Sequence, residues 1–301
     1  MRILITGGSG FIGTHLTKFL LAKNHIVTIF DNFSNSSKDS MSFFVEKGVE
    51  IIEGDIMNHN EIFNATKNKE VVIHLAAKIS VSESMKNPIE TFEVNVEGTK
   101  NVLNACEKNH IKKFIASSSA AVYGEGDNNS PLNENSKTLP ISPYGESKLK
   151  MEKEIREFKS KHNMKCIILR FFNIYGEGQT PEYAGVITKF IERIKQSKPL
   201  EIFGDGLQTR DFISIEDIIN SIYCAISTDK SGTYNIASGK TTSIKELAEY
   251  MVFLAGKKLK IHNIEPLKGD IKNSQADITL AKKELGFSPK FKLDKIKELF
   301  G

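Results

Sequence analysis

Tyr144 and Lys148 are the first residues whose types and spacing suggest chemistry, because they stand four apart in the segment SPYGESK. Residues four apart on an α-helix lie on one face, one above the other. A free phenol has a pKa near ~10, and a neighbouring ammonium favours the phenolate. The pair therefore predicts a tyrosine base with a lysine partner. The same spacing also occurs in ordinary surface pairs, so it needs support from elsewhere in the chain.

Three consecutive serines, Ser117–Ser119, provide such support. They lie at the end of an expected strand, Lys113–Ser117. Ligands of parallel sheets bind at the carboxyl ends of the strands, so a hydroxyl there would meet a substrate. Serines also occur in turns and helix caps, which is the alternative interpretation of the triplet.

A glycine-rich turn near the start of the chain predicts a bound dinucleotide. Gly7, Gly10 and Gly13 are spaced three apart, after an expected strand at Arg2–Thr6 and at the start of an expected helix at Gly10–Ala22. Such glycines allow a tight turn, close approach of the backbone to a pyrophosphate, and close packing of helix on strand. The helix N-terminus then faces the anion. The alternative is an ordinary βαβ turn.

Asp31 ends the second expected strand, Ile26–Asp31. A carboxylate at this place bonds the adenosine ribose hydroxyls and repels a 2′-phosphate, so NAD is expected as the cofactor rather than NADP. The positive nicotinamide ring would then act together with Lys148 and bring the pKa of Tyr144 towards ~7, where a general base works best.

Apolar runs alternate with helix-length segments through the first half of the chain, which predicts an α/β fold. We expect a Rossmann-type doubly wound parallel sheet. Its strands are expected at Arg2–Thr6, Ile26–Asp31, Glu50–Glu53, Val71–Leu75, Lys113–Ser117 and Cys166–Phe171. Its helices are expected at Gly10–Ala22, Glu61–Lys67, Pro88–Lys108 and Tyr144–Lys161.

The rhythm loosens after Asn173, which predicts a smaller α/β substrate-binding lobe. We expect residues 1–173, with about 206–239, to form the NAD-binding domain, and about 174–205 and 240–301 to form the lobe. Helices are expected at Tyr183–Gln196 and Ser214–Ser227, and strands at Pro199–Phe203, Gly232–Ile236 and around Lys258–His262. Two or three helices should follow Ser243.

Composition excludes several classes of function. With 41 basic and 37 acidic residues the net charge is only +4, too mild to suggest a nucleic-acid or membrane partner. No apolar run reaches membrane-spanning length. The cysteines lack metal-ligand spacing, so we expect no metal site, and they are expected as buried thiols: Cys106, Cys166 and Cys224. Because the first expected strand begins at residue 2, we expect no signal peptide and a cytoplasmic protein.

A few further segments have open or modest interpretations. His74, at the end of a buried strand, is expected as a packed core residue rather than a ligand. Asp55 could reach an adenine or serve as a plain turn residue. Asp127–Pro140 is expected as a surface loop, and Gly176–Gly185 as a connection lying over the ligand.

The motifs GGSGFIG, SSSAAVYG, SPYGESK and RFFNIYG together resemble the extended short-chain dehydrogenases/reductases. The resemblance runs from Met1 to about Phe287 and is strongest to the NAD-dependent sugar-nucleotide epimerases of the UDP-glucose 4-epimerase type. It implies Ser119, Tyr144 and Lys148 as catalytic residues. It implies contacts to NAD from Gly7, Gly10, Phe11, Ile12, Gly13, Asp31, Asn32, Asp55, Ile56, Leu75, Ala76, Ala77, Asn95, Ser117, Tyr144, Lys148 and Phe171.

The same resemblance implies a UDP-sugar substrate and its contacts. Asn173 and Arg210 would face the diphosphate, and Asp270 a nucleotide ribose. The full substrate set is Ser119, Tyr144, Asn173, Val186, Phe203, Arg210, Asp270 and Ser274. Ser274 would stand beside C2 of the sugar, where a small residue admits N-acetylhexosamines.

Two departures refine the expected reaction. Related dehydratases and decarboxylases carry Asp-Glu or Glu after the catalytic Ser or Thr, whereas this chain has Ala120 and Ala121, which favours 4-epimerisation. Leu267 stands where the family often has an arginine, with Lys268 next to it. A dehydratase or reductase, or a non-catalytic nucleotide-sensing protein, remains the alternative.

The family resemblance also implies a homodimer. It pairs the helices at Pro88–Lys108 and Tyr144–Lys161 with their copies in a four-helix interface. The apolar residues expected to serve it on the first helix are Phe92, Val96, Val102 and Leu103.

Overall fold

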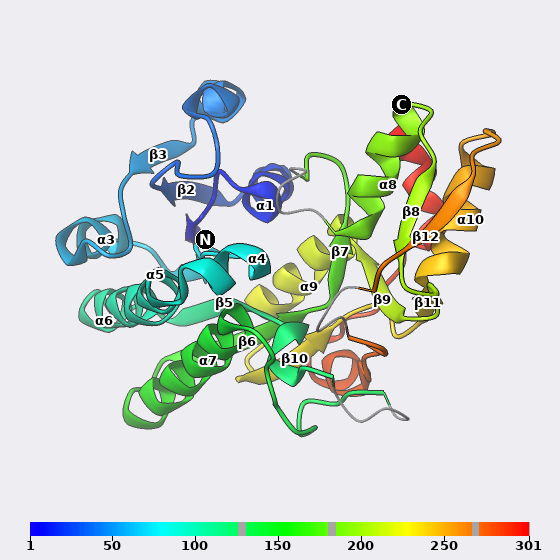
Figure 1. Ribbon diagram of the computed structural model, residues 1–301. Coiled ribbons are helices and arrows are strands. Elements are labelled where there is room, and N and C mark those ends of the chain that lie inside the picture. The colour runs from blue at the N-terminus through cyan, green and yellow to red at the C-terminus, as the bar shows by residue number, and fades with distance from the viewer. Residues whose placement is uncertain (126–130, 180–184, 267–270, 301) are drawn as a thin grey trace.

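A seven-stranded parallel sheet forms the centre of the computed structural model, which describes residues 1–125, 131–179, 185–266 and 271–300. The strand order is β10-β6-β5-β4-β1-β2-β3, a doubly wound arrangement that reverses between β1 and β4 (Figure 1). This confirms the predicted fold class. The strands are β1 Arg2–Thr6, β2 Ile26–Asp31, β3 Glu50–Glu53, β4 Val71–His74, β5 Lys113–Ser119, β6 Lys165–Phe171 and β10 Gly232–Ile236.

Helices cover both faces of this sheet because alternate side chains of its apolar strands point to opposite sides. Ile3 and Ile5 of β1 pack in one core with α1 (Phe11–Ala22) and α9 (Ile215–Ser227). Leu4 between them packs in a second core, on the other face. The helices of that face are α3 His59–Thr66, α6 Thr99–Lys108 and α7 Pro143–Lys161.

The single helix expected at Pro88–Lys108 is interrupted, so that prediction was wrong in part. α5 (Pro88–Phe92) passes into a π-helical stretch, Glu93–Gly98, before α6 begins. Within this stretch polar Asn95 is only 1% exposed. Gly98 allows Ile56 to pack closely, since a Cβ on the glycine would lie 2.6 Å from the isoleucine Cδ1. The interruption turns a buried amide towards the neighbouring loop, a use often found for π turns.

The apolar residues expected to serve a dimer surface are turned inward instead. Val96, Val102 and Leu103 are at most 4% exposed, and the last two belong to the core beneath the sheet. Phe92 is half-buried. These side chains are thus occupied by the packing of their own chain. The outward side chains of this region form ion pairs: Lys100 with Glu97 and Glu154, and Lys150 with Glu154.

A second group of elements with its own apolar core forms the smaller lobe, on the right in Figure 1. Its helices α8 (Val186–Lys195) and α10 (Ile244–Leu254) pack beside a two-stranded parallel sheet of β8 (Leu200–Phe203) and β12 (Ile261–Ile264). Two further helical turns near the end of the chain are Ala281–Leu285, which is π-helical, and Leu293–Phe300, which is 3₁₀-helical.

A third, small sheet stands between the two lobes and was not predicted. β9 (Thr209–Ser214) pairs with β7 (Asn173–Tyr175) and β11 (Thr241–Ser243). Its outer strands have three residues each, too short to show an alternating pattern in the sequence. The lobe boundaries themselves stay a prediction.

Two other short helices were also missed. α4 (Val81–Lys86) is capped by Ser80, and α2 (Ser42–Glu46) follows a 3₁₀ turn at Lys38–Met41. Segments of five or six residues carry too few turns for a helical period to emerge.

The expected surface loop at Asp127–Pro140 is anchored rather than loose. Its first residues lie outside the described chain, but Leu132 is 5% exposed and forms a bridge with Ala276. Glu134 Oε1 accepts a hydrogen bond from the backbone N–H of Asn235. The described part of the segment, residues 131–140, is thus the predicted surface loop, since its residues other than Leu132 are exposed or half-buried.

The structure also shows the state of the cysteines, and it bears on membrane-spanning helices and metal-binding clusters. Cys106 and Cys166 are buried, Cys224 is partly buried, and all three are free. Across the described ranges, no helix is both long and apolar enough to cross a bilayer. The same ranges hold no cluster of three or more His, Cys, Asp or Glu side chains that could bind a metal ion.

Candidate functional site

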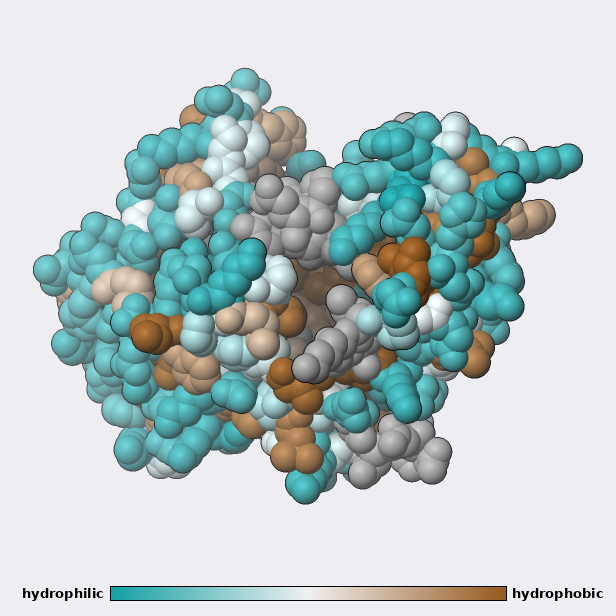
Figure 2. Space-filling model, viewed as in Figure 1, coloured by the Kyte–Doolittle hydropathy of each residue, from teal (hydrophilic) through white to brown (hydrophobic). Residues whose placement is uncertain are grey.

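A cavity of about 350 Å³ opens at the carboxyl ends of the central strands, where the strand order reverses. Figure 2 shows the surface hollowed between the two lobes. Every residue predicted to contact NAD lines the cavity except Asn95, and Ser119 lines it as well. Lining residues that the sequence did not reveal include Ser9, Ser34, Asn35, Ser36, Lys78, Ile79, Val94, Ile174 and Gln179.

The glycine turn shows three distinct reasons for its glycines. Gly7 has φ +69°, and a Cβ there would lie 2.6 Å from the backbone nitrogen of Ala76. A Cβ on Gly13 would lie 2.6 Å from the backbone of Gly8. Gly10 is less crowded, since a Cβ there would meet only the Gly7 carbonyl oxygen, at 3.4 Å, and it precedes α1 without a side-chain cap. The uncapped helix N-terminus and the open side of Gly10 fit a pyrophosphate.

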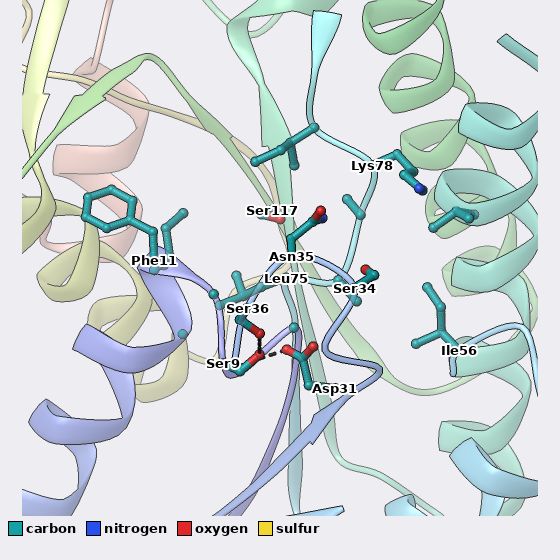
Figure 3. Close-up of a pocket in the computed structure, with 18 of the residues that line it drawn as sticks. Ser9, Phe11, Asp31, Ser34, Asn35, Ser36, Ile56, Leu75, Lys78 and Ser117 are labelled. Carbon is teal, nitrogen blue, oxygen red and sulfur yellow. Dashed lines mark hydrogen bonds between the residues drawn. The ribbon is translucent and has the colours of Figure 1, made fainter. Parts of the chain in front are cut away.

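Asp31 holds the next wall of the cavity, at the end of β2. Its carboxylate accepts hydrogen bonds from the backbone N–H of Ser9 at 3.0 Å and of Phe33 at 2.9 Å. The Ser9 and Ser36 hydroxyls lie 2.5 Å apart, which folds the following loop over the turn (Figure 3). The run of polar residues that follows Asp31 in the sequence could have predicted this loop. Together, Asp31 and the loop place a carboxylate and several hydroxyls where a ribose would bind.

Asp55 is a turn residue that also lines the cavity, and its contact with an adenine stays a prediction. It lines the cavity, and its carboxylate also accepts hydrogen bonds from Asn32 Nδ2 at 2.9 Å and from the Met57 N–H at 2.8 Å. The aspartate is therefore a turn residue whose remaining acceptor capacity faces the cavity.

Asn95 does not line the cavity but supports its wall. The side chain accepts from the backbone N–H of Lys78 at 2.8 Å and donates to the Lys78 carbonyl at 3.0 Å and to Ser147 Oγ at 2.9 Å. It thereby ties the segment after β4 to α7. Direct contact of Asn95 with the cofactor stays a prediction. Lys78 directly follows the predicted Leu75–Ala77 stretch, which was the signal that could have found it.

The catalytic candidates meet where β5 ends against α7. Lys148 Nζ donates to the Ser117 carbonyl at 3.0 Å, and Ser119 lies close enough to Tyr144 to lower the pKa of its phenol. Ser142 caps α7 by accepting from the N–H of Gly145 at 3.1 Å, which fixes the first turn of the helix and hence its tyrosine. The helical spacing and the strand end thus bring the predicted groups together.

Burial shifts the pKa values of both catalytic candidates. Burial lowers the pKa of Lys148 to about 8. Burial raises the pKa of Tyr144, and Ser119 opposes that rise. The protein alone therefore keeps the phenol protonated. The lowering expected from Lys148 together with the nicotinamide ring stays a prediction.

His74 is a core residue, as predicted. It is 2% exposed, with Nδ1 2.7 Å from Thr6 Oγ1 and Nε2 2.9 Å from Thr99 Oγ1. Burial lowers its pKa to about 3, so the ring stays neutral and fixes β1 to α6.

The other described residues of the predicted substrate set do not line the cavity: Asn173, Val186, Phe203, Arg210 and Ser274. Asn173 Nδ2 donates to the Asp211 carbonyl at 3.4 Å, and Arg210 Nη1 donates to the carbonyl of Ile271 at 2.5 Å. Ser274 is buried. Val186 begins α8 and Phe203 ends β8. Asp270, Leu267 and Lys268 lie outside the described residues, so the roles of this set stay predictions.

A doubly wound sheet whose first turn fits a dinucleotide, with a Tyr–Lys helix packed against a serine strand end, is the architecture of the extended short-chain dehydrogenases/reductases. The chain belongs to the NAD dependent epimerase/dehydratase family, whose model matches residues 3–237. The resemblance noted from the motifs is thereby confirmed, and so is NAD as the cofactor of this class.

Similar proteins cover nearly the whole chain. A protein of Methanocaldococcus jannaschii, provisionally named a UDP-glucose 4-epimerase, is 38% identical over 97% of this chain and 94% of its own length. The crystal structure of the Thermotoga maritima UDP-glucose 4-epimerase with UDP-glucose has a TM-score of 0.94 at 32% identity, over 100% and 97% of the two chains. The UDP-N-acetylglucosamine 4-epimerase of Methanobrevibacter ruminantium, in complex with UDP-N-acetylmuramic acid, has a TM-score of 0.91 at 34% identity, over 99% and 95%.

Proposed function

We propose that this protein is an NAD-dependent 4-epimerase of UDP-hexoses, with UDP-glucose and UDP-galactose as substrates. One observation carries the choice of reaction. Among the described residues that line the cavity, the carboxylates are Asp31 and Asp55. Both belong to the end that is expected to hold the adenosine. The end with the catalytic candidates has the Ser119 hydroxyl, the Tyr144 phenol and the Lys148 ammonium. Epimerisation at C4 needs only a base and a hydride acceptor, whereas elimination needs a further acid near the neighbouring carbons.

The chain's own residues then divide the work at C4. Tyr144 takes the proton of the C4 hydroxyl and later returns it, while Ser119 holds that oxygen. Lys148 contributes a positive charge beside the phenol. Bound NAD⁺ supplies the hydride acceptor for C4 and a positive ring that lowers the pKa of Tyr144. The 4-keto sugar must rotate within the site so that the second transfer reaches its opposite face.

The glycine turn, Asp31 and the loop after it would hold the cofactor throughout the cycle. Because the hydride is borrowed and returned, no net oxidation occurs and NAD need not leave. The acidic Asp31 favours NAD over NADP, since a 2′-phosphate would face its carboxylate. We further propose that the protein is cytoplasmic and acts as a homodimer.

Product analysis tests the proposal against its alternatives. The purified protein is incubated with UDP-galactose, without added NAD or reductant, and the products are identified by NMR. An epimerase yields UDP-glucose. A dehydratase yields a 4-keto-6-deoxy sugar, and a nucleotide-sensing protein leaves the sugar unchanged. A reductase is distinguished in a second incubation, to which NADH is added and in which it consumes the NADH.

A further inference from the structure

α7 meets the serine triplet of β5 at three points, of which the proposed reaction uses two. Tyr144 and Lys148 make the first two, with the last serine and with the carbonyl of Ser117. The third lies one helical turn further on, where Ser118 Oγ donates to Glu152 Oε1 at 2.6 Å. Glu152 has 0% exposure, so a carboxylate without an assigned role lies directly beneath the catalytic groups.

Glu152 is held in place by two arginines as well as by the serine. Arg170 of β6 donates from Nε to Oε1 at 2.8 Å and from Nη2 to Oε2 at 2.7 Å, a bidentate pair. Arg156 Nη1 donates to Oε2 at 3.0 Å. Ser118 and Arg170 are register partners on adjacent strands, so both face the helix that carries the carboxylate. Four donors thus fix both of its oxygens.

The buried polar side chains that begin with Ser118 and Arg170 continue onto the next strand of the sheet. Asn235 of β10 is the register partner of Arg170 on its other side. Arg170 Nη1 donates to Tyr123 Oη at 2.8 Å, and that hydroxyl donates to Asn235 Oδ1 at 2.6 Å. These side chains are at most 3% exposed. A buried ion pair is weak evidence for stability, because apolar replacements are often equally good. The charges therefore point to a role in the site above them.

We propose that Glu152 is a positioning residue for Lys148. Held by Arg170, it keeps α7 in register with β5 and places a fixed negative charge four residues beyond the lysine, so that the lysine stays an ammonium in its buried place. The proposal rests on the proposed function only through the role given to Lys148.

The direction of each charge effect supports this arrangement. Burial lowers the pKa of Lys148 to about 8, and the charge of Glu152 opposes the lowering. For Glu152 burial acts to raise the pKa, but the hydrogen bonds and charge of Arg170, with bonds from Ser118 and Arg156, outweigh burial, and the pKa is lowered. The Glu152 carboxylate is therefore ionised at the pH values at which Lys148 titrates.

The other titratable groups around the pair do not supply this charge. His74 of β4 faces Lys148, and burial lowers the pKa of its ring to about 3, so it is neutral. Burial raises the pKa values of Tyr144 and Tyr123, which are neutral as well. The acidic side chains of the outer face are paired there, Glu154 with Lys150 at 3.3 Å and with Lys100 at 3.8 Å. Among the described residues, Glu152 is the carboxylate whose charge raises the pKa of Lys148.

Direct titration of the lysine tests the proposal without any substrate. The protein is labelled with [ε-¹³C]lysine, and the Lys148 resonance is assigned by its loss in Lys148→Met. We expect the wild-type resonance to titrate near pH 8 and that of Glu152→Gln to titrate lower by about one pH unit, since the negative charge that favours the buried ammonium is then absent. The alkaline limb of the kcat/KM profile should move by the same amount.

Two controls separate charge from structure. Glu154→Gln removes a carboxylate from the same helix but from its outer face, and Ser118→Ala removes a hydrogen bond while leaving all charges. Both should leave the Lys148 midpoint unchanged. If Glu152→Gln does not fold, Glu152→Gln with Arg170→Met removes the whole buried ion pair, and its midpoint should also lie below the wild-type value.

A midpoint equal to the wild-type value in folded Glu152→Gln, or in the double variant, would overturn the proposal, even if the melting temperature falls. Because the titration needs no turnover, absence of epimerase activity would leave this test intact and would contradict only the proposed function.

Discussion

Tyr144 offers a sharp test at the scale of a single residue, because phenylalanine keeps the ring and removes only the hydroxyl. We expect Tyr144→Phe to fold and to bind NAD while losing at least ~10²-fold in kcat, the lower range for a general base. Steady-state kinetics with UDP-galactose measure the loss. Tyr223→Phe is the matched control, since that ring packs against Phe19 away from the cavity. Turnover near the wild-type value in Tyr144→Phe would disprove its role as base.

Ser274 concerns the choice of sugar. We expect the wild type to accept UDP-N-acetylgalactosamine as well as UDP-galactose, because a small residue beside C2 leaves room for an acetamide, and close-packed sites select by volume. Ser274→Tyr should reduce kcat/KM for the N-acetyl sugar by more than that for UDP-galactose. The ratio of the two values is the measurement. A wild type that rejects the N-acetyl sugar, or an unchanged ratio in the variant, would refute the assignment.

The sequence predicted those site residues that lie in short motifs, and it missed those whose role depends on contacts with distant segments. Gly7, Asp31 and Tyr144 lie in short motifs at the ends of strongly patterned strands, and each was predicted. Nothing in the sequence around Glu152 predicted its buried ion pair, because the partner is an arginine 18 residues further along the chain, on another element. Asn95 was predicted as a contact, yet its amide is directed to a loop 17 residues earlier.

At the scale of elements, β9 joins segments that are far apart in the sequence. Asp211 on this strand has 0% exposure, and its carboxylate accepts from Ser238 N at 2.9 Å, Ser238 Oγ at 2.6 Å, Gly239 N at 3.0 Å and Ala276 N at 3.3 Å. It thus fastens the turn after β10 and the segment before the last helical turns to the strand that carries Arg210.

Removing this carboxylate should loosen the whole junction. We expect Asp211→Ala to lower the free energy of unfolding by about 3 kcal/mol, because several buried donors lose their acceptor. Urea denaturation measures the change, and Asp229→Ala, on the exposed surface, is the control expected to resemble the wild type. A loss below about 1 kcal/mol would show that water replaces the carboxylate without difficulty.

The elements themselves were predicted unevenly, for physical reasons. The long apolar strands of the large sheet are buried on both faces and show as unbroken apolar runs. β7, β9 and β11 were missed, because strands of three to six residues with mixed polarity are formed by their partners rather than by their own pattern. The π-helical stretch at Glu93–Gly98 was invisible for the same reason, since buried contacts of Asn95 and Gly98 define it.

At the scale of the whole molecule, exposed apolar side chains suggest where a second copy would bind. Val81 and Met85 of α4 and Ile89 of α5 are 49%, 62% and 74% exposed. Three of the four residues first expected at the interface are buried. α4 and α5 both contact α7, so a homodimer through this region would lie beside the helix of the catalytic pair.

We expect the mass of a dimer in light scattering at micromolar concentration. Met85→Glu with Ile89→Glu should reduce it to that of a monomer, because burying two carboxylates in an apolar contact is unfavourable. Phe253→Glu is the control, since Phe253 is 76% exposed on the distant α10. A wild type that is monomeric at this concentration would contradict the proposed assembly.

The central claim is that the hydride taken from C4 returns to the same carbon of the sugar. UDP-galactose carrying deuterium at C4 tests it most directly, with the protein as purified and no added cofactor. We expect UDP-glucose that retains deuterium at C4, as read by ²H NMR and mass spectrometry. Deuterium lost to solvent, or found at another carbon of the product, would contradict 4-epimerisation by return of the hydride.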